Sequence, residues 1–265
     1  MTKIAAVQMI SAVSIDTNIA TARRLITQAA EQGADLVLLP EYWPSLEAQD
    51  ADKLVHAEEA GGGKIQDFMS GMAKELGIWL VGGTMSIRSN VPGKVLNTMM
   101  VYNPQGENVA RYDKIHLFSF SKGDESYDES KSIAPGDKVV TFEAPFGRVG
   151  LSVCYDLRFP ELYRAMGTCS VMVMPAAFVY TTGRVHWEIL LRARAIENQC
   201  YLLASGQGGK HETGRRTWGH SMVVSPWGEI LDVLPEGEGV VIAELDVQQM
   251  ADIRERLPAL KHRKL

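Results

Sequence analysis

The chain has 265 residues, of which 46% are hydrophobic and 22% charged, and this composition suits one large α/β domain spanning residues 1–265. A net charge of −5 at pH 7 gives no electrostatic reason to expect nucleic acid or a membrane surface as a partner, and no apolar run is long enough to span a bilayer. The three cysteines include no CxxC pair, which argues against a disulfide scaffold and a structural zinc site, so we expect a reduced, cytoplasmic protein without a metal.

Hydrophobic patterning at the start of the chain predicts strands that alternate with amphipathic helices. The expected strands are Lys3–Met9, Asp35–Leu39 and Ile78–Ile87, and the expected helices are Asp16–Gln32 and Lys64–Leu76. Asp16 or Thr17 is the expected N-cap of the first helix, and Gly33 is its expected stop. Two strand–helix–strand passages imply a sheet that is at least partly parallel, with helices covering one face.

In the middle of the chain the pattern changes to hairpins. The expected strands are Thr98–Tyr102, Glu107–Tyr112, Val139–Phe142 and Arg148–Val153. The first two flank an Asn-Pro-Gln-Gly turn, which is typical of a strand pair. The polar stretch from Ser119 to Asp137 is too long for a plain connector, so we expect it to be a functional loop or lid.

The last part of the chain alternates again and carries an internal echo. The expected helices are Pro160–Met166, Arg184–Asn198 and Val247–Arg256, and the expected strands are Ser170–Met174, Cys200–Ser205, His220–Val224, Glu229–Val233 and Gly239–Leu245. Residues 100–107 match residues 222–229 at five of eight positions, 122 residues apart. Chance reuse of a Pro-x-Gly turn is one explanation. The other is a pseudo-symmetric fold with two stacked sheets and helices outside, an α-β-β-α sandwich.

One stretch combines strand, turn and helix signals around a cysteine. The apolar run Val149–Val153 ends abruptly at Cys154, and Pro160 then opens a helical segment. A thiol at the end of a strand and near the start of a helix is favoured as a thiolate, the form that attacks carbon. The alternative is that Cys154 is a small buried apolar residue, as most free cysteines are.

Glu41, Lys114 and Cys154 each follow an expected strand, so they can converge on one pocket. A glutamate in an apolar pocket, with its pKa raised, can take the thiol proton and pass it to a leaving amine. Lys114 and the backbone N–H of Tyr155 can hold the oxyanion, and Lys114 would favour the thiolate. Taken singly, Glu41 could cap a loop and Lys114 could be a solvated lysine.

Three segments in this order resemble the motifs of the nitrilase (carbon–nitrogen hydrolase) superfamily. They are Leu38–Glu41, Tyr112–Leu117 and Val153–Glu161. The resemblance implies a Glu–Lys–Cys triad, an α-β-β-α sandwich, hydrolysis of an amide or related C–N bond without a cofactor, and a homodimer or larger homo-oligomer. Asp128–Gly136 resembles the segment that carries a second glutamate in this superfamily, which implies that Glu129 is a fourth catalytic residue. From the residues themselves, Glu129 would be an ordinary solvated charge.

Further segments resemble the Nit branch, whose members are amidases acting on amides that also carry an α-keto acid. These segments are Cys154–Phe159, Ala177–Phe178, Thr182–Gly183, His186–Glu188 and Arg192–Gln199. Gly206–His211 and Gly219–Val224 are more similar to the group acting on deaminated glutathione, whereas Tyr112–Phe118 is more similar to the ω-amidases. Both small-molecule amides therefore stay open as substrates, of the deaminated glutathione or the α-ketoglutaramate type.

Arg158 lies four residues beyond Cys154, so the same turn can aim its guanidinium at a substrate carboxylate. The alternative is an internal salt bridge with Asp156 or Glu161. Tyr155, the residue after Cys154, is a further candidate for binding the substrate. Three others follow the strand that ends at Pro175 and would complete a polar clamp. They are Tyr180, Thr181 and Thr182.

Other functions are alternatives to the amidase hypothesis. Within the superfamily, an N-carbamoyl amide or aliphatic nitrile hydrolase would not rely on Arg158, and outside enzymology the chain would be a catalytically idle binding module. A Cys–His hydrolase would need an ordered histidine base, but each histidine is more typical of a hydrogen-bonded structural residue. The histidines considered are His116, His186 and His220, and the cysteines expected to be inert are Cys169 and Cys200.

Overall fold

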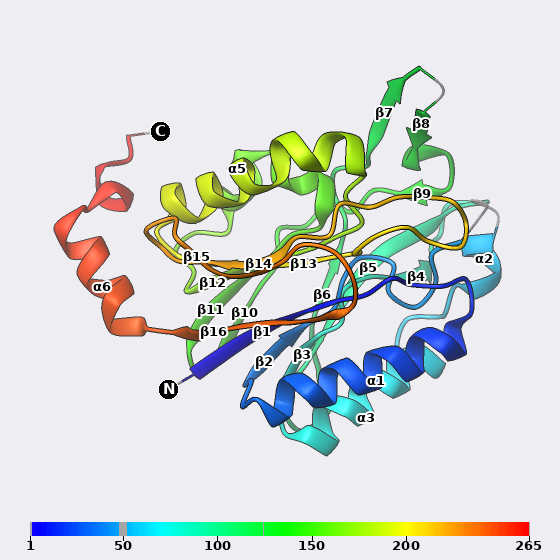
Figure 1. Cartoon of the computed structure of the whole chain (residues 1–265), viewed down its shortest axis with the longest axis horizontal. Coiled ribbons are helices and arrows are strands. Elements are labelled where there is room, and N and C mark those ends of the chain that lie inside the picture. The colour runs from blue at the N-terminus through cyan, green and yellow to red at the C-terminus, as the bar shows by residue number, and fades with distance from the viewer. Residues whose placement is uncertain (1, 48–51, 124, 265) are drawn as a thin grey trace.

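In the computed structural model, which describes residues 2–47, 52–123 and 125–264, two β-sheets stack face to face with helices outside them (Figure 1). Within these residues the first sheet has eight strands: β16 (Gly239–Leu245), β1 (Thr2–Gln8), β2 (Leu36–Leu38), β3 (Trp79–Val81), β5 (Val95–Tyr102) and β4 (Met85–Arg88) in order, with β6 (Asn108–Asp113) and β9 (Ile133–Ala134) also paired to β5. The second has six: β10 (Thr141–Ala144), β11 (Gly147–Leu151), β12 (Val171–Ala176), β13 (Tyr201–Gly206), β14 (Ser221–Val224) and β15 (Ile230–Leu234).

The helices lie on the outer faces of this sandwich. Those beside the first sheet are α1 (Ile15–Glu31) and α3 (Lys64–Leu76), and those beside the second are α4 (Pro160–Ala165) and α5 (Tyr180–Asn198) (Figure 1). The remaining ones are α2 (Asp52–His56), α6 (Val247–Arg256) and the short 3₁₀ turns η1 (Glu129–Lys131), η2 (Cys154–Arg158) and η3 (Ala259–His262). The two stacked mixed sheets with outer helices confirm the expected α-β-β-α sandwich. No helix among the described residues has both the length and the apolar character needed to cross a membrane.

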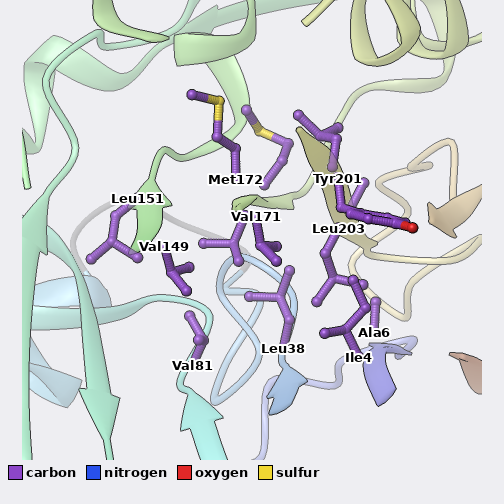
Figure 2. Close-up of a cluster of buried hydrophobic side chains, with 14 of the residues drawn as sticks. Ile4, Ala6, Leu38, Val81, Val149, Leu151, Val171, Met172, Tyr201 and Leu203 are labelled. Carbon is purple, nitrogen blue, oxygen red and sulfur yellow. The ribbon is translucent and has the colours of Figure 1, made fainter. Parts of the chain in front are cut away.

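The central strands are apolar on both faces because both faces are covered. On β1, Ile4 and Ala6 belong to the core between the sheets, whereas Ala5 and Val7 belong to the core under the helices. Figure 2 shows the core between the sheets, where side chains from the two sheets meet. The labelled side chains there include Leu38 and Val81 from the first sheet and Val149, Leu151, Val171 and Leu203 from the second.

Strand direction brings the ends of several strands to one edge. β2 and β3 are parallel, β5 is antiparallel to β3, and β6 is antiparallel to β5, so β6 runs in the same direction as β2. Glu41 follows β2 and Lys114 follows β6, so both lie at the same edge of the first sheet. In the second sheet β11 and β12 are parallel, which places Cys154 and Ala177 together at their carboxyl ends.

The internal echo corresponds to two hairpins of the same shape, one in each sheet. In both turns the first residue donates its N–H to the last residue's carbonyl, in Asn103–Glu107 and in Ser225–Glu229. Both ladders also shift register next to corresponding valines, Val101 in one hairpin and Val223 in the other. This shared detail favours the pseudo-symmetric interpretation over chance reuse of a turn.

Three local expectations were wrong. The N-cap of α1 is Ser14, whose hydroxyl accepts from the N–H of Thr17, because its backbone is extended and Asp16 already lies in the first turn. The strand expected at 78–87 is two strands, because the chain turns at Gly83 with φ 52°. The expected loop at 119–137, of which residue 124 lies outside the described residues, forms the hairpin β7 (Ser119–Lys122) and β8 (Glu125–Asp128), then η1 and β9.

Candidate active site

Cys154 lies on a strained turn immediately after β11. Val153 is extended with φ −135°, and Cys154 then takes φ 48°, in the left-handed region that non-glycine residues seldom occupy. Such a residue costs about 1–3 kcal/mol of conformational strain and occurs preferentially at functional sites. Tyr155 lies in the first turn of η2, where backbone N–H groups have no partner within the helix. The turn therefore offers a thiol and a free donor side by side.

Glu41 is held by three hydrogen-bond donors and is only 1% exposed. Its Oε1 accepts from Lys114 Nζ at 2.9 Å and from Asn97 Nδ2 at 2.9 Å, and its Oε2 accepts from the N–H of Ala177 at 2.8 Å. The expectation of an apolar pocket around Glu41 was therefore wrong. Since Ala177 follows a strand of the second sheet, this last bond also joins the two sheets at the site.

Lys114 is completely buried and lies between two carboxylates. Its Nζ is 2.9 Å from Glu41 Oε1 and 2.8 Å from Glu129 Oε2. Burial by itself would lower the pKa of Lys114, but Glu129, Glu41 and Cys154 together raise it above the usual lysine value. Lys114 is therefore a permanent cation in the site, and the interpretation of Lys114 as a solvated lysine does not hold.

Glu129 belongs to the same cluster and is not a solvated charge. It accepts from Lys114 Nζ, from the N–H of Phe118 at 2.7 Å and from the hydroxyl of Tyr42 at 2.9 Å. Burial and the nearby Glu129 charge raise the pKa of Tyr42, so this hydroxyl keeps its proton and remains a donor. The structure thus brings together Glu41, Lys114, Glu129 and Cys154, the four residues predicted to be catalytic, without assigning their roles.

The expectation that Cys154 is a thiolate was wrong for the free protein. Burial raises the pKa of this thiol well above its usual value, and Glu41 raises it further, while Lys114 lowers it. Lys114 is paired with both Glu41 and Glu129, so those two carboxylates largely neutralise its positive charge. Cys154 therefore holds its proton at neutral pH and needs a base to become a nucleophile.

Asp156 fixes the position of Cys154 relative to Lys114. This buried carboxylate accepts from the N–H of Val153 at 2.8 Å and from the hydroxyl of Tyr112 at 2.7 Å, and it lies 2.7 Å from His116 Nδ1. Val153 immediately precedes Cys154, and the other two partners flank Lys114. Asp156 is thus occupied by these partners and does not form the salt bridge with Arg158 considered as an alternative.

A small cavity of about 10 Å³ lies over Cys154. Two of the predicted substrate-binding residues line it, Tyr155 and Thr182, and Thr182 Oγ1 is buried with no hydrogen-bond partner among the described residues. Arg158 lies beside the cavity, with its guanidinium carbon 5.4 Å from the ring centroid of Phe178 and Nη1 3.3 Å from His186 Nδ1. Its guanidinium therefore contacts two residues that line the cavity, Tyr155 and Phe178, without lining the cavity itself.

Tyr180 and Thr181 do not line this cavity. Both lie in the first turn of α5, which begins earlier than expected. The ring of Tyr180 stacks on the guanidinium of Arg216 at 3.7 Å, and the hydroxyl of Thr181 donates to Glu125 at 2.8 Å. The predicted clamp is therefore wrong for these two residues, because only Thr182 of the three lines the cavity over Cys154.

Sequence reasoning missed several residues of the site. Asn97 is a buried amide within the apolar strand β5, and a polar residue inside such a run is a signal that could have identified it. Phe118 and Arg215 line the cavity, but neither stands in a periodic pattern that indicates a pocket. The N–H of Ala177 bonds Glu41 through backbone geometry, which no residue type reveals.

The histidines and the other cysteines have structural contacts. His116 stacks on Phe159 at 3.7 Å, and His220 stacks on Trp218 at 4.0 Å. Cys169 and Cys200 are buried, and burial raises the pKa of Cys169 to about 11. These contacts support the expectation of structural histidines and inert core thiols.

Comparison with known proteins gives concordant matches. The family model described as carbon-nitrogen hydrolase matches residues 3–255. Deaminated glutathione amidase of Yersinia enterocolitica is 39% identical, covering 98% of this chain and 92% of that protein, and human omega-amidase NIT2 is 39% identical, covering 99% and 95%. The crystal structure of Saccharomyces cerevisiae Nit3, a member of branch 10 of the nitrilase superfamily, matches with a TM-score of 0.88 and 31% identity over 100% of this chain and 97% of that one.

Proposed function

This chain belongs to the carbon–nitrogen hydrolase family and hydrolyses non-peptide C–N bonds, and we propose that it is an amidase that forms a thioester on Cys154. The observation that carries the proposal is the hydrogen-bonded cluster of Glu41, Lys114 and Glu129 around a thiol on a positive-φ turn. A buried nucleophile, a base and a fixed cation within one cavity are what acyl transfer requires.

In the first half of the reaction, Glu41 takes the proton of Cys154 as sulfur attacks the amide carbon. The carbonyl oxygen becomes an oxyanion, held by Lys114 and the N–H of Tyr155. Glu41 then passes the proton to the amide nitrogen, the C–N bond breaks, and ammonia or an amine leaves the thioester. The raised pKa of Cys154 supports this order, since the proton leaves sulfur only when a base receives it.

In the second half, water attacks the thioester carbon. Glu41 removes a proton from the water, the C–S bond breaks, and the carboxylic acid is released as sulfur regains a proton. Glu129 positions the amide and then the water, because it lies against Lys114 and is held by Tyr42 and Phe118. No step requires a cofactor.

The substrate is proposed to be a small amide bearing a carboxylate, of the deaminated glutathione or α-ketoglutaramate type. Two relatives at 39% identity carry these two names, so identity does not separate the substrates. Arg158, stacked beside the cavity, is the proposed partner of a carboxylate on the acyl half. An N-carbamoyl amide or nitrile hydrolase would keep its activity in Arg158→Ala, whereas the proposed amidase would lose most of kcat/KM.

The experiment that tests the proposal is acid quenching during turnover of α-ketoglutaramate, followed by mass spectrometry of the intact protein. We expect an acyl adduct on Cys154 and a burst of ammonia before the steady state. Cys154→Ala should abolish both, while Cys169→Ala, which removes a buried thiol away from the site, should keep both. Full activity of Cys154→Ala would refute the thioester mechanism, and an idle binding module would show no turnover in any variant.

A homodimer or larger homo-oligomer is also proposed, and exposed apolar residues on α5 support it. Val185 is 50% exposed, Ile189 68% and Ile196 50%, and their spacing puts them on one side of the helix. Trp227, in the turn between β14 and β15, is 57% exposed, and this turn is bonded to α5 through Arg192 and Gly228. The cytoplasmic location stays a prediction from the sequence.

A further inference from the structure

Asn97 is a buried amide on a strand face that is otherwise apolar. It lies in β5, on the same face as Met99 and Val101, whose side chains belong to the core between the sheets, and it is only 1% exposed. A buried polar group costs free energy unless it is hydrogen-bonded, so most such groups have partners for their donors and acceptors. The partners of Asn97 therefore indicate what its side chain does.

The side chain of Asn97 is bonded to the candidate active site. Its Nδ2 donates to Glu41 Oε1 at 2.9 Å, while its Oδ1 is buried with no hydrogen-bond partner among the described residues. Its backbone carbonyl accepts from the N–H of Lys114 at 3.0 Å, so the same residue also holds the strand end that carries the buried cation. Within the described residues, the one hydrogen bond of this side chain goes to the proposed base, and its role lies in the site rather than in the stability of the core.

The two carboxylate oxygens of Glu41 differ in the number of donors that they receive. Each oxygen of a carboxylate can accept about two hydrogen bonds. Oε1 accepts from Lys114 Nζ and from Asn97 Nδ2, both at 2.9 Å, so its capacity is filled. Among the described residues one nitrogen donor binds Oε2, the N–H of Ala177 at 2.8 Å, which leaves one lone pair of Oε2 open.

The open lone pair is the place for the thiol proton. Glu41 and Cys154 line the same small cavity, and a hydrogen bond with Glu41 is one of the causes that raise the pKa of the thiol. Because Oε1 is filled, Oε2 is the oxygen that can accept this proton. The two donors on Oε1 and the one on Oε2 also fix the plane of the carboxylate. Without the amide of Asn97, Oε1 would have an open lone pair as well, and the carboxylate would be free to turn.

We propose that Asn97 is a positioning residue of the amidase reaction, which occupies Oε1 of Glu41 and thereby makes Oε2 the oxygen that carries the proton. The inference rests on the proposed thioester mechanism and deepens it. As the bond between sulfur and the amide carbon forms, the S–H bond of Cys154 breaks and its proton moves to Oε2. As the C–N bond breaks, the same proton moves from Oε2 to the leaving nitrogen. Asn97 keeps its own protons throughout and acts through Glu41.

The test replaces Asn97 by leucine, which has nearly the same shape and no donor, and follows the release of ammonia from α-ketoglutaramate in single turnovers with enzyme in excess. The maximal rate constant should fall ~10- to 100-fold, the size of a lost hydrogen bond to a charged group. The enzyme concentration that gives half the maximal rate should change less than about threefold, because Asn97 is not among the described residues that line the cavity over Cys154. The solvent deuterium isotope effect on the rate constant should rise, since proton transfer to a poorly oriented base then limits the reaction.

Asn198→Leu is the matched control, because Asn198 is also buried and donates one hydrogen bond, to the carbonyl of Arg194 in the same helix. It should keep the wild-type rate constant and isotope effect. Asn97→Ala, which lacks the donor and the bulk of leucine, should be slowed as well, and it carries the test if urea unfolding shows that Asn97→Leu does not fold.

A rate constant of the folded Asn97 variants within about threefold of the wild type would overturn the inference and leave the amidase proposal intact. An equal fall in Asn198→Leu, or a fall with an unchanged isotope effect, would overturn it too, because Asn97 would then support the fold alone. Weaker binding at an unchanged maximal rate would overturn it by placing Asn97 on the substrate. A wild type that forms no acyl adduct on Cys154 would refute the proposed mechanism itself.

Discussion

At the thiol of Cys154, burial and the carboxylate of Glu41 act in the same direction, and Lys114 acts against them. The sequence predicted that Cys154 is a nucleophile because it is a thiolate. In the structure Cys154 can act as the nucleophile during turnover although it is a protonated thiol in the free protein. Lys114 neutralises two carboxylates, so little of its charge remains for sulfur. A resting thiol protects the site from oxidants and electrophiles until a substrate brings its carbonyl to Cys154 and Glu41 receives the proton.

This balance predicts how the rate of alkylation of Cys154 depends on pH. Because its pKa is raised, the thiolate fraction at pH 7 is small, and alkylation by iodoacetamide should be slower than for a free thiol and should rise with pH beyond 9. Glu41→Gln removes the charge that opposes ionisation, so alkylation at pH 7 should become faster, while amidase activity is lost.

The measurement is the rate of adduct formation on Cys154, followed by peptide mass spectrometry between pH 6 and pH 10. Unmodified Cys169 and Cys200 in the same digests serve as internal controls, because both thiols are buried. Alkylation of the wild type that is fast at pH 7 and flat with pH would contradict the protonated thiol. Slower alkylation in Glu41→Gln would contradict the electrostatic role given to Glu41.

Among the elements, the break between β3 and β4 at Gly83 contributes to the position of Glu41. The chain turns at Gly83, where it packs against the backbone of Leu39 and Pro40, the residues that follow β2. A Cβ on Gly83 would lie 2.1 Å from the carbonyl oxygen of Pro40. The next residue, Thr84, accepts from the N–H of Tyr42 at 3.0 Å. The turn between β3 and β4 therefore contacts the residues on both sides of Glu41, Pro40 and Tyr42, and helps to position Glu41.

Replacement of Gly83 by alanine should therefore displace Glu41. Gly83 has φ 52° and no room for a methyl group, so we expect a loss of stability of about 2–4 kcal/mol and a fall in kcat of at least about tenfold. Gly93→Ala is the matched control, because Gly93 also has a positive φ, 75°, but nothing lies within 4 Å of its added Cβ. It should lose about 1 kcal/mol and keep its kcat.

Urea unfolding and steady-state kinetics measure the two effects on the same preparations. If Gly83→Ala and Gly93→Ala lose equal stability and both keep kcat, the close approach to Pro40 does not position Glu41. A fall in kcat that exceeds the loss expected from unfolded protein would support the positioning role.

On the scale of the whole molecule, the site lies where the two sheets end together. Glu41 and Lys114 come from the first sheet, and Cys154 and Ala177 come from the second. The hydrogen bond from the Ala177 N–H to Glu41 and the contacts of Asp156 with Tyr112 and His116 cross between the sheets. Relative movement of the sheets would therefore separate the nucleophile from its base, and the packed core between them prevents it.

The exposed apolar side of α5 predicts assembly. Ile189 is 68% exposed, so Ile189→Glu should lower the mass of the assembled protein in light scattering by burying a charge at the contact. Val91→Glu, at an exposed position between β4 and β5, is the control and should leave the mass unchanged. A wild-type protein that is monomeric at micromolar concentration, or an unchanged mass in Ile189→Glu, would contradict the proposed contact.

The sequence by itself determined the elements whose periodicity is strong and the order of the three motifs. Lys64–Leu76, Gly239–Leu245 and Val247–Arg256 have the predicted bounds, because amphipathic spacing and local capping decide such segments. The positions of Glu41, Lys114 and Cys154 directly after strands were also sufficient to predict that the three converge on one pocket. Strand direction places Glu41 and Lys114 at one edge of the first sheet, but the stacking of the second sheet, which carries Cys154, against that edge comes from the fold.

Only the tertiary structure decided what surrounds these residues. Three features depend on contacts between segments far apart in the chain. Glu41 has three donors, Cys154 keeps its proton, and Thr182 rather than Tyr180 lines the cavity over the thiol. Arg215 is the clearest case, because the sequence around it has no periodicity. Arg215 lines the cavity over Cys154, in a loop where the Arg215 carbonyl accepts from the N–H of His211 and the His211 ring contacts the carbonyl of Ser11. Hydrogen bonds and burial are properties of the folded neighbourhood, whereas periodicity is a property of the chain.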